Sequence, residues 1–179
     1  MPSADRKPRE RFWSPERRSR WTMFGLFGAT ASIFAGLTAW SDRHALLVNA
    51  STSLPNWAFM LDRERLPVRG DHVFFEPPPS DLLQRHFGPD PQPFGKIVYG
   101  VAGDRVERRG RLFLVNGKPV ALAKPMSRRG EPLAPGPTGV LPRGCYFVAT
   151  PNPDSFDSRY AAIGWICRAR IVGVGEAIL

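Results

Sequence analysis

Residues 21–40 carry no charged side chain, and this stretch restricts the possible folds of the chain more than any other feature. Thirteen of the twenty residues are apolar, three are glycine and four are serine or threonine, and Trp21 and Trp40 stand at the two ends. A helix of this length spans ~30 Å, the thickness of the hydrocarbon core of a bilayer. Tryptophan is enriched at both membrane–water interfaces. The stretch therefore predicts a transmembrane anchor over residues 21–41.

Two other interpretations of this stretch are weaker. A cleaved signal peptide usually has an apolar region of only ~7–15 residues, and no clean cleavage site of small residues follows Ala39. A buried core helix is disfavoured because a basic cluster precedes the twenty uncharged residues. The favoured interpretation is an anchor that stays attached to the domain behind it.

The positive charge of the chain is concentrated before the anchor. Residues 1–20 hold seven Lys or Arg and three Asp or Glu, so they contribute +4 to a net charge of +9. By the positive-inside rule this basic segment stays in the cytoplasm and residues 42–179 lie across the membrane. The high isoelectric point also suggests nucleic acid, but the chain contains no recognised nucleic-acid-binding module. We therefore expect the lipid bilayer, and no nucleic acid, as a partner.

Residues 42–179 are expected to form one mainly β domain, a system of bent antiparallel sheets or a partial barrel. The chain contains 19 prolines and 17 glycines, which interrupt helices and favour short strands joined by turns. A single short helix is expected at residues 80–86, with loops over residues 76–93 and 124–143. Asn116-Gly117 predicts a tight hairpin. Strands are predicted at residues 45–48, 57–61, 71–75, 95–101, 105–108, 111–115, 119–122, 145–150 and 170–175.

No metal or cofactor is expected. The three histidines, His44, His72 and His86, have no metal-binding spacing, so we interpret them as surface or structural residues. Cys145 and Cys167 are not spaced as a zinc pair. If the domain is exported, they can form a disulfide, and two buried thiols are the alternative; the sequence leaves both open.

Three segments carry residues with possible chemistry, namely Asn49–Pro55, Gly95–Asp104 and Gly144–Tyr160. Each taken alone has an ordinary structural interpretation, such as turn serines before a proline. Lys96, however, lies among apolar residues in a strand that we expect to be buried on both faces. Burial lowers the pKa of a lysine, and a neutral amine can accept the proton of a serine hydroxyl.

Taken together, these segments resemble the type I signal peptidase family, which are membrane-anchored serine proteases with a Ser–Lys dyad. Ser53-Leu54-Pro55 matches the nucleophile motif, and Lys96 is followed at the family's spacing by Gly103-Asp104. Residues 154–160 match the terminal box of the family in six of seven positions. The motifs occur in the family's order behind an anchor.

Within the family, the chain is most similar to the TraF-type conjugative transfer peptidases. Residues 49–55 fit the nucleophile segment of this branch, and Val101–Asp104 reads Val-Ala-Gly-Asp, as is usual there. A single anchor and the small size also fit. Ile97 and residues 56–58 depart from the common pattern of the branch.

The resemblance implies roles for individual residues. Ser53 would be the nucleophile and Lys96 the general base. The Ser53 backbone N–H and the Ser51 hydroxyl would form the oxyanion hole, and Ser155 would orient the lysine.

The resemblance gives the remaining residues of the terminal box a structural role. Asp157 and Arg159 are expected to pair and hold their loop.

Because twelve residues separate Trp40 from Ser53, the site is expected near the membrane. Trp57, Phe59 and Met60 are then either core residues or a rim that touches lipid.

The implied function is that of a serine endopeptidase in the bacterial inner membrane with a periplasmic catalytic domain. Its expected substrate is a membrane-inserted or exported precursor, in particular a conjugative pilin precursor, and other proteins of the conjugation apparatus are possible partners. A housekeeping signal peptidase that removes leader peptides is one alternative. A non-catalytic, single-pass assembly component of a transfer or pilus apparatus is another.

Overall fold

The computed structural model describes residues 15–48 and 56–178, and it begins with one long helix, α1 (Pro15–Arg43). Residues 20–43 of α1 are long enough and apolar enough to cross a membrane. The hydroxyls of Thr30 and Ser32 donate to the carbonyls of Leu26 and Gly28, each at 2.9 Å. Such bonds within the helix satisfy hydroxyls without needing water. The expected N-terminal apolar helix is therefore confirmed, while its crossing of a membrane stays a prediction.

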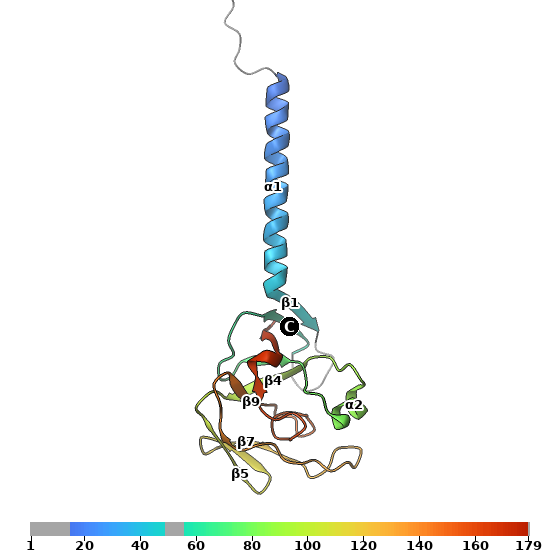
Figure 1. Cartoon of the computed structure of the whole chain (residues 1–179), viewed down its shortest axis with the longest axis vertical. Coiled ribbons are helices and arrows are strands. Elements are labelled where there is room, and N and C mark those ends of the chain that lie inside the picture. The colour runs from blue at the N-terminus through green and yellow to red at the C-terminus, as the bar shows by residue number, and fades with distance from the viewer. Residues whose placement is uncertain (1–14, 49–55, 179) are drawn as a thin grey trace, which may run out of the picture. The chain divides into compact units, whose positions relative to one another are not determined.

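The chain divides into two compact units, residues 1–42 and 43–179, and the regular secondary structure of the second consists mainly of antiparallel strands (Figure 1). Seven strands form one sheet in the order β1-β2-β11-β3-β4-β9-β10, and four form another in the order β7-β6-β5-β8. The strands are β1 (His44–Val48), β2 (Ala58–Asp62), β3 (His72–Phe75), β4 (Phe94–Gly100), β5 (Arg105–Arg109), β6 (Leu112–Val115), β7 (Lys118–Leu122), β8 (Gly139–Val140), β9 (Cys145–Ala149), β10 (Ile166–Cys167) and β11 (Ile171–Ala177). The predicted mainly β class is confirmed.

The last strand of the chain lies inside the larger sheet. β11 lies between β2 and β3, with Val174 opposite both Asp62 and Val73. Gly175 has no side chain because there is no room for one: a Cβ there would stand 2.5 Å from Cε2 of Phe74. Glycine thus allows the C-terminal strand to pack tightly against the ring that fills this part of the core.

Two short strands correct the sequence-based expectation. β8 lies within residues 124–143, which we predicted as a loop, and β10 was not predicted at all. Both contain only two residues, so no alternation of apolar and polar side chains could reveal them. The predicted short helix is present as α2 (Asp81–Phe87), inside the segment predicted as a loop over residues 76–93.

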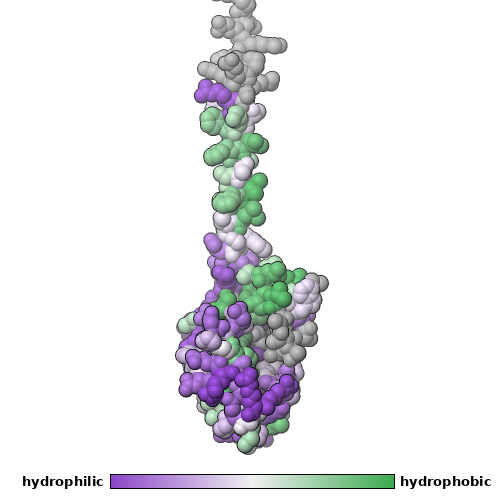
Figure 2. Space-filling view, turned by 90° about the vertical axis from the view of Figure 1, so that its right-hand side faces the viewer, coloured by the Kyte–Doolittle hydropathy of each residue, from purple (hydrophilic) through white to green (hydrophobic). Residues whose placement is uncertain are grey.

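The apolar residues that follow the nucleophile motif divide between core and surface. Phe59 is fully buried and contacts Phe74, with ring centroids 5.0 Å apart. Trp57 precedes β2 and is 56% exposed. Further exposed apolar side chains come from β1, where Val48 pairs with Ala58, and from Ile178, whose N–H donates to the Ala58 carbonyl. Figure 2 shows hydrophobic residues gathered on one part of the domain surface.

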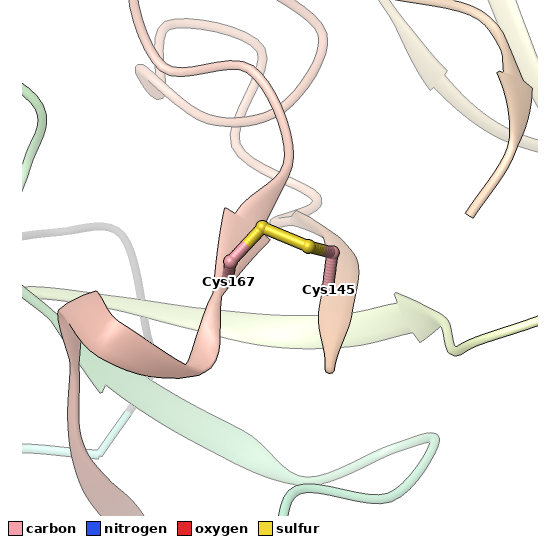
Figure 3. Close-up of a disulfide and its surroundings, with 2 residues drawn as sticks. All are labelled: Cys145 and Cys167. Atoms are coloured by element: carbon pink, nitrogen blue, oxygen red, sulfur yellow. A yellow bond between two sulfur atoms is a disulfide. The ribbon is translucent and has the colours of Figure 1, made fainter. Parts of the chain in front are cut away.

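The cysteine alternative is decided in favour of a disulfide. Cys145 and Cys167 are directly opposite each other in the antiparallel pair β9–β10 and are bonded (Figure 3). The bond closes a loop of 22 residues, for which the chain-entropy treatment gives about 3 kcal/mol of stabilisation. This loop contains the whole terminal box, residues 154–160, so the crosslink restrains the segment that carries the candidate site.

Candidate active site

Lys96 lies in β4, in the interior of the larger sheet between β3 and β9. Alternation along the strand buries Lys96, Val98 and Gly100 on one face, and Lys96 is only 4% exposed. Ile97 and Tyr99 on the other face are half-buried. The expectation of burial on both faces is therefore corrected. Only the face that carries the lysine is fully buried, and the other face is partly exposed.

The environment of Lys96 shifts its protonation equilibrium toward the neutral amine. Burial lowers the pKa of Lys96 to about 8, since a charged ammonium loses its hydration there. The nearby Asp157 carboxylate opposes this change in the pKa and Arg159 adds to it. The Nζ atom also lies 5.3 Å from the centre of the Phe94 ring. A base with a pKa near 8 can accept a proton close to neutral pH.

A cleft of about 720 Å³ opens beside Lys96. Its walls come from segments that are far apart in the sequence: the end of β1, α2, the start of β4, the connector after β7 and the terminal box. Most of the lining is apolar or aromatic. The lining residues include Leu47, Val48, Phe74, His86, Phe87, Phe94, Lys96, Lys124, Met126, Arg128, Leu133, Asp154, Ser155, Phe156 and Tyr160.

Ser155 lines the same cleft as Lys96 and is 4% exposed. Within the described part of the chain its Oγ has no hydrogen-bond partner, and the same holds for Oγ1 of Thr150. Thr150 is one step beyond the Ile97–Ala149 pair of β4 and β9, which places it across from Lys96. Sequence reasoning missed Thr150, although a hydroxyl at the end of a buried strand could have indicated it.

Asp157 and Arg159 form a buried, two-pronged ion pair. The Arg159 Nε donates to Asp157 Oδ1 at 2.7 Å and an Nη to Oδ2 at 2.6 Å, with both side chains almost fully buried. Arg159 also donates to the carbonyls of Thr150, Asn152 and Leu122. Asp157 accepts from the Thr150 N–H at 3.2 Å. The pair therefore holds the loop on which Ser155 stands.

Asp104 of the Gly-Asp motif has a structural position outside the cleft. Its carboxylate accepts from the Val101 N–H and the Asn116 amide, each at 2.7 Å, and from Arg69 at 2.6 Å. Gly103 adopts φ 87°, which glycine tolerates without strain. The motif thus ends β4 with a tight turn and connects it to the hairpin of the smaller sheet.

His86 lines the cleft and belongs to a polar cluster on α2 and the connector after β7. His86 and Arg85 of α2 both contact Glu131, which also accepts from Ser127 at 3.0 Å. These contacts lower the pKa of Glu131 to about 2. His86 is therefore a structural residue that also lines the cleft. No local pattern could have indicated it, because its partner is 45 positions away.

The remaining predicted site residues, Ser51 and Ser53, lie outside the described residues. The first described range ends at Val48, which lines the cleft. The second begins at Asn56, just before β2. Their assignment as oxyanion donor and nucleophile stays a prediction.

The chain is similar to conjugal transfer proteins and to a signal peptidase of known structure. A probable conjugal transfer protein TraF from Sinorhizobium fredii is 30% identical over an alignment 179 residues long. This alignment covers 93% of this chain and 93% of the relative. The conjugal transfer protein TraF of Agrobacterium fabrum is 28% identical over 155 residues, covering 79% of this chain and 88% of the relative. A signal peptidase I from Enterococcus faecalis V583 is 26% identical, with a TM-score of 0.38, over 62% of this chain and 97% of its own.

A protein-family model also matches most of the chain. The family model described as signal peptidase, peptidase S26, matches residues 18–179. This confirms the resemblance inferred from the three motifs. Because the match extends from within the long helix to the last residue, the protein belongs to the signal peptidase family, peptidase S26.

Proposed function

We propose that this protein is a membrane-anchored serine endopeptidase that cleaves a precursor protein by a Ser53–Lys96 dyad. The observation that carries the proposal is a buried lysine that lines the same large cleft as Ser155 and whose pKa is lowered to about 8. A lysine with no catalytic use would be costly to retain in such a position.

In the proposed reaction, the neutral Nζ of Lys96 accepts the proton of the Ser53 hydroxyl as Oγ attacks the scissile carbonyl carbon. The Ser53 N–H and the Ser51 hydroxyl stabilise the resulting oxyanion. Lys96, now protonated, donates that proton to the departing amine, leaving an acyl-enzyme. Water, or the amine of another chain end, then attacks the ester and regenerates Ser53. Ser155 keeps the amine of Lys96 directed at the nucleophile.

The membrane arrangement is part of the proposal. α1 crosses the inner membrane with residues 1–20 in the cytoplasm, and residues 42–179 form the periplasmic peptidase domain. The exposed apolar side chains of Leu46, Val48, Trp57 and Ile178 support contact between the domain and lipid. Substrates are then presented where a scissile bond lies just beyond a membrane-spanning segment.

A conjugative pilin precursor is the proposed substrate, and other conjugation proteins are the proposed partners. The names of the two relatives support this assignment, since both are described as conjugal transfer proteins. A housekeeping signal peptidase would use the same residues on many exported proteins. A non-catalytic assembly component would need neither Ser53 nor Lys96.

The test is to incubate the purified full-length protein in detergent with a conjugative pilin precursor and to measure the products by mass spectrometry. We expect one defined cleavage, absent from the Ser53→Ala variant. A product one water lighter than the linear form would show joining of the new ends. Cleavage of leader-peptide precursors but not of the pilin precursor would favour the housekeeping role, and cleavage of neither would contradict the proposed enzyme.

The pH dependence of cleavage should follow Lys96. Below its pKa of about 8 the amine is protonated and cannot act as a base, so kcat/KM should fall about tenfold for each pH unit. Above that pKa the rate should level off. The measurement is initial cleavage rate from pH 5.5 to 9.5 at constant ionic strength. A rate that stays flat down to pH 6 would exclude a lysine base.

A further inference from the structure

One end of the cleft carries more positive than negative charge. Lys124 and Arg128 both line the cleft, and both contact the same carboxylate, that of Asp154. The Arg128 Nη2–Asp154 Oδ2 distance is 2.7 Å. Two cations with one shared anion leave one positive charge without compensation. We call these three residues the cationic end of the cleft.

The backbone fixes the positions of these residues, while the cations stay accessible. The Lys124 N–H donates to the Tyr160 hydroxyl at 3.0 Å, and the Asp154 N–H donates to Asn152 Oδ1 at 2.9 Å. The side chain of Asp154 is 19% exposed, whereas those of Lys124 and Arg128 are 42% and 78% exposed. An incoming anion can therefore reach the two cations without displacing the loop.

The surrounding charges do not cancel this excess. Among the described residues that line the cleft, Asp154 is the only carboxylate. His86 is occupied by Glu131, which is shared with Arg85. Hydrogen bonds from Lys124 and Arg128 lower the pKa of Asp154, so it stays ionised and keeps both cations in place. The apolar walls reduce the local dielectric response and strengthen attraction of an anion.

We propose that the cationic end binds a carboxylate of the peptide substrate, either an acidic side chain or a free C-terminus. Asp154 of the cationic end is adjacent to Ser155 in the sequence and both line the cleft, so the carboxylate would be held in the same cleft as the scissile bond. This inference rests on the proposed function, because the peptide is taken to lie along the cleft that contains Lys96. The remaining lining would accept apolar residues of the same peptide.

Four peptides of one sequence test this inference. They carry Glu or Gln at one position near the cleavage site, each with either a free or an amidated C-terminus. Affinity is measured by fluorescence anisotropy of labelled peptide on the full-length Ser53→Ala protein in a neutral detergent, and cleavage is measured with the unsubstituted nucleophile. We expect the favoured carboxylate peptide to bind about tenfold more tightly than the uncharged peptide at low salt. The peptide pair that shows this difference identifies the side chain or the C-terminus as the source.

Variants of the cationic end should change this preference in opposite directions. Arg128→Gln should weaken the preference, and Lys124→Gln combined with Arg128→Gln should abolish it, while binding of the uncharged peptide stays within about twofold. Asp154→Asn should increase the preference, because it removes the competing carboxylate. Arg109→Gln, in β5, is the matched control and should change nothing.

The two failures are distinguishable. Equal affinity of all four peptides, or a preference that persists in the double variant, would overturn the inference. Absence of cleavage with every peptide would instead count against the proposed function. The binding measurement on Ser53→Ala would still decide whether the cationic end selects carboxylates.

Discussion

Replacing Lys96 by methionine is expected to abolish cleavage and at the same time to stabilise the domain. Methionine fills a similar volume but cannot accept a proton, so the cleavage rate should fall by at least about 10³-fold. The fall of the lysine pKa from 10.5 to about 8 corresponds to about 3 kcal/mol of destabilisation by the buried charge. If the unfolding free energy of Lys96→Met exceeds that of the parent protein by about this amount at pH 7, the buried lysine destabilises the folded domain.

The sign of this effect can be checked against pH. Between pH 8 and pH 10.5 the unfolded chain binds more protons at this lysine than the folded one, so stability of the parent protein rises with pH in that window. The advantage of Lys96→Met should therefore be complete below pH 8 and shrink toward pH 10.5. Urea unfolding of the full-length protein in detergent measures it. Lys118→Met, at an exposed position of β7, is the control and should leave both activity and this pH trend unchanged.

Two outcomes would contradict the assignment. Retained cleavage in Lys96→Met would exclude the lysine as base. Lost cleavage together with a large loss of stability would mean that the lysine supports the fold rather than the chemistry. Ser53→Ala should lose cleavage at least as strongly, and a variant that retains it would identify another nucleophile.

Neutralising Asp157 is expected to have the largest effect on stability. Asp157→Asn keeps the shape of the side chain but leaves the guanidinium of Arg159 buried without its counter-ion. Breaking a buried pair in this way costs about 3–5 kcal/mol. The loop that Arg159 ties to Thr150 and Asn152 would lose its restraint, and with it the position of Ser155.

An exposed pair provides the matched control for this prediction. Glu176→Gln removes one carboxylate from an ion pair with Arg65 whose side chains are 80% and 36% exposed, and should cost less than about 1 kcal/mol. The two variants should also differ in their pH profiles. Asp157 raises the pKa of Lys96, so Asp157→Asn should move the acid limb of the cleavage rate to lower pH, whereas Glu176→Gln should not. Equal stabilities of the two variants would exclude the role assigned to the buried pair.

Much of the fold was accessible from local patterns. The uncharged stretch predicted the long helix, and the apolar runs around Lys96 predicted a buried strand. Asn116-Gly117 predicted the hairpin between β6 and β7, where Asn116 adopts φ 50°. These features depend on residues that are neighbours in the sequence, so the sequence contains the information directly.

Other features depend on contacts that no local pattern contains. The two-residue strands β8 and β10 exist only because a partner strand is already in place. Spacing alone left the cysteines undecided, because a distance of 22 residues along the chain says nothing about the distance in space. The antiparallel register of β9 and β10 brings them together.

The sequence by itself determined the family, the long apolar helix and the mainly β class, and it predicted the candidate dyad, because each of these is expressed in short motifs or in composition. Only the tertiary structure decided what surrounds Lys96. The burial of Lys96, the Asp157–Arg159 pair that holds the loop of Ser155 and the cleft with its cationic end are built from β1, α2, β4, the connector after β7 and the terminal box. A pKa and a binding surface arise from the sum of charges and contacts in space, and segments separated by tens of residues contribute to that sum only after the chain has folded.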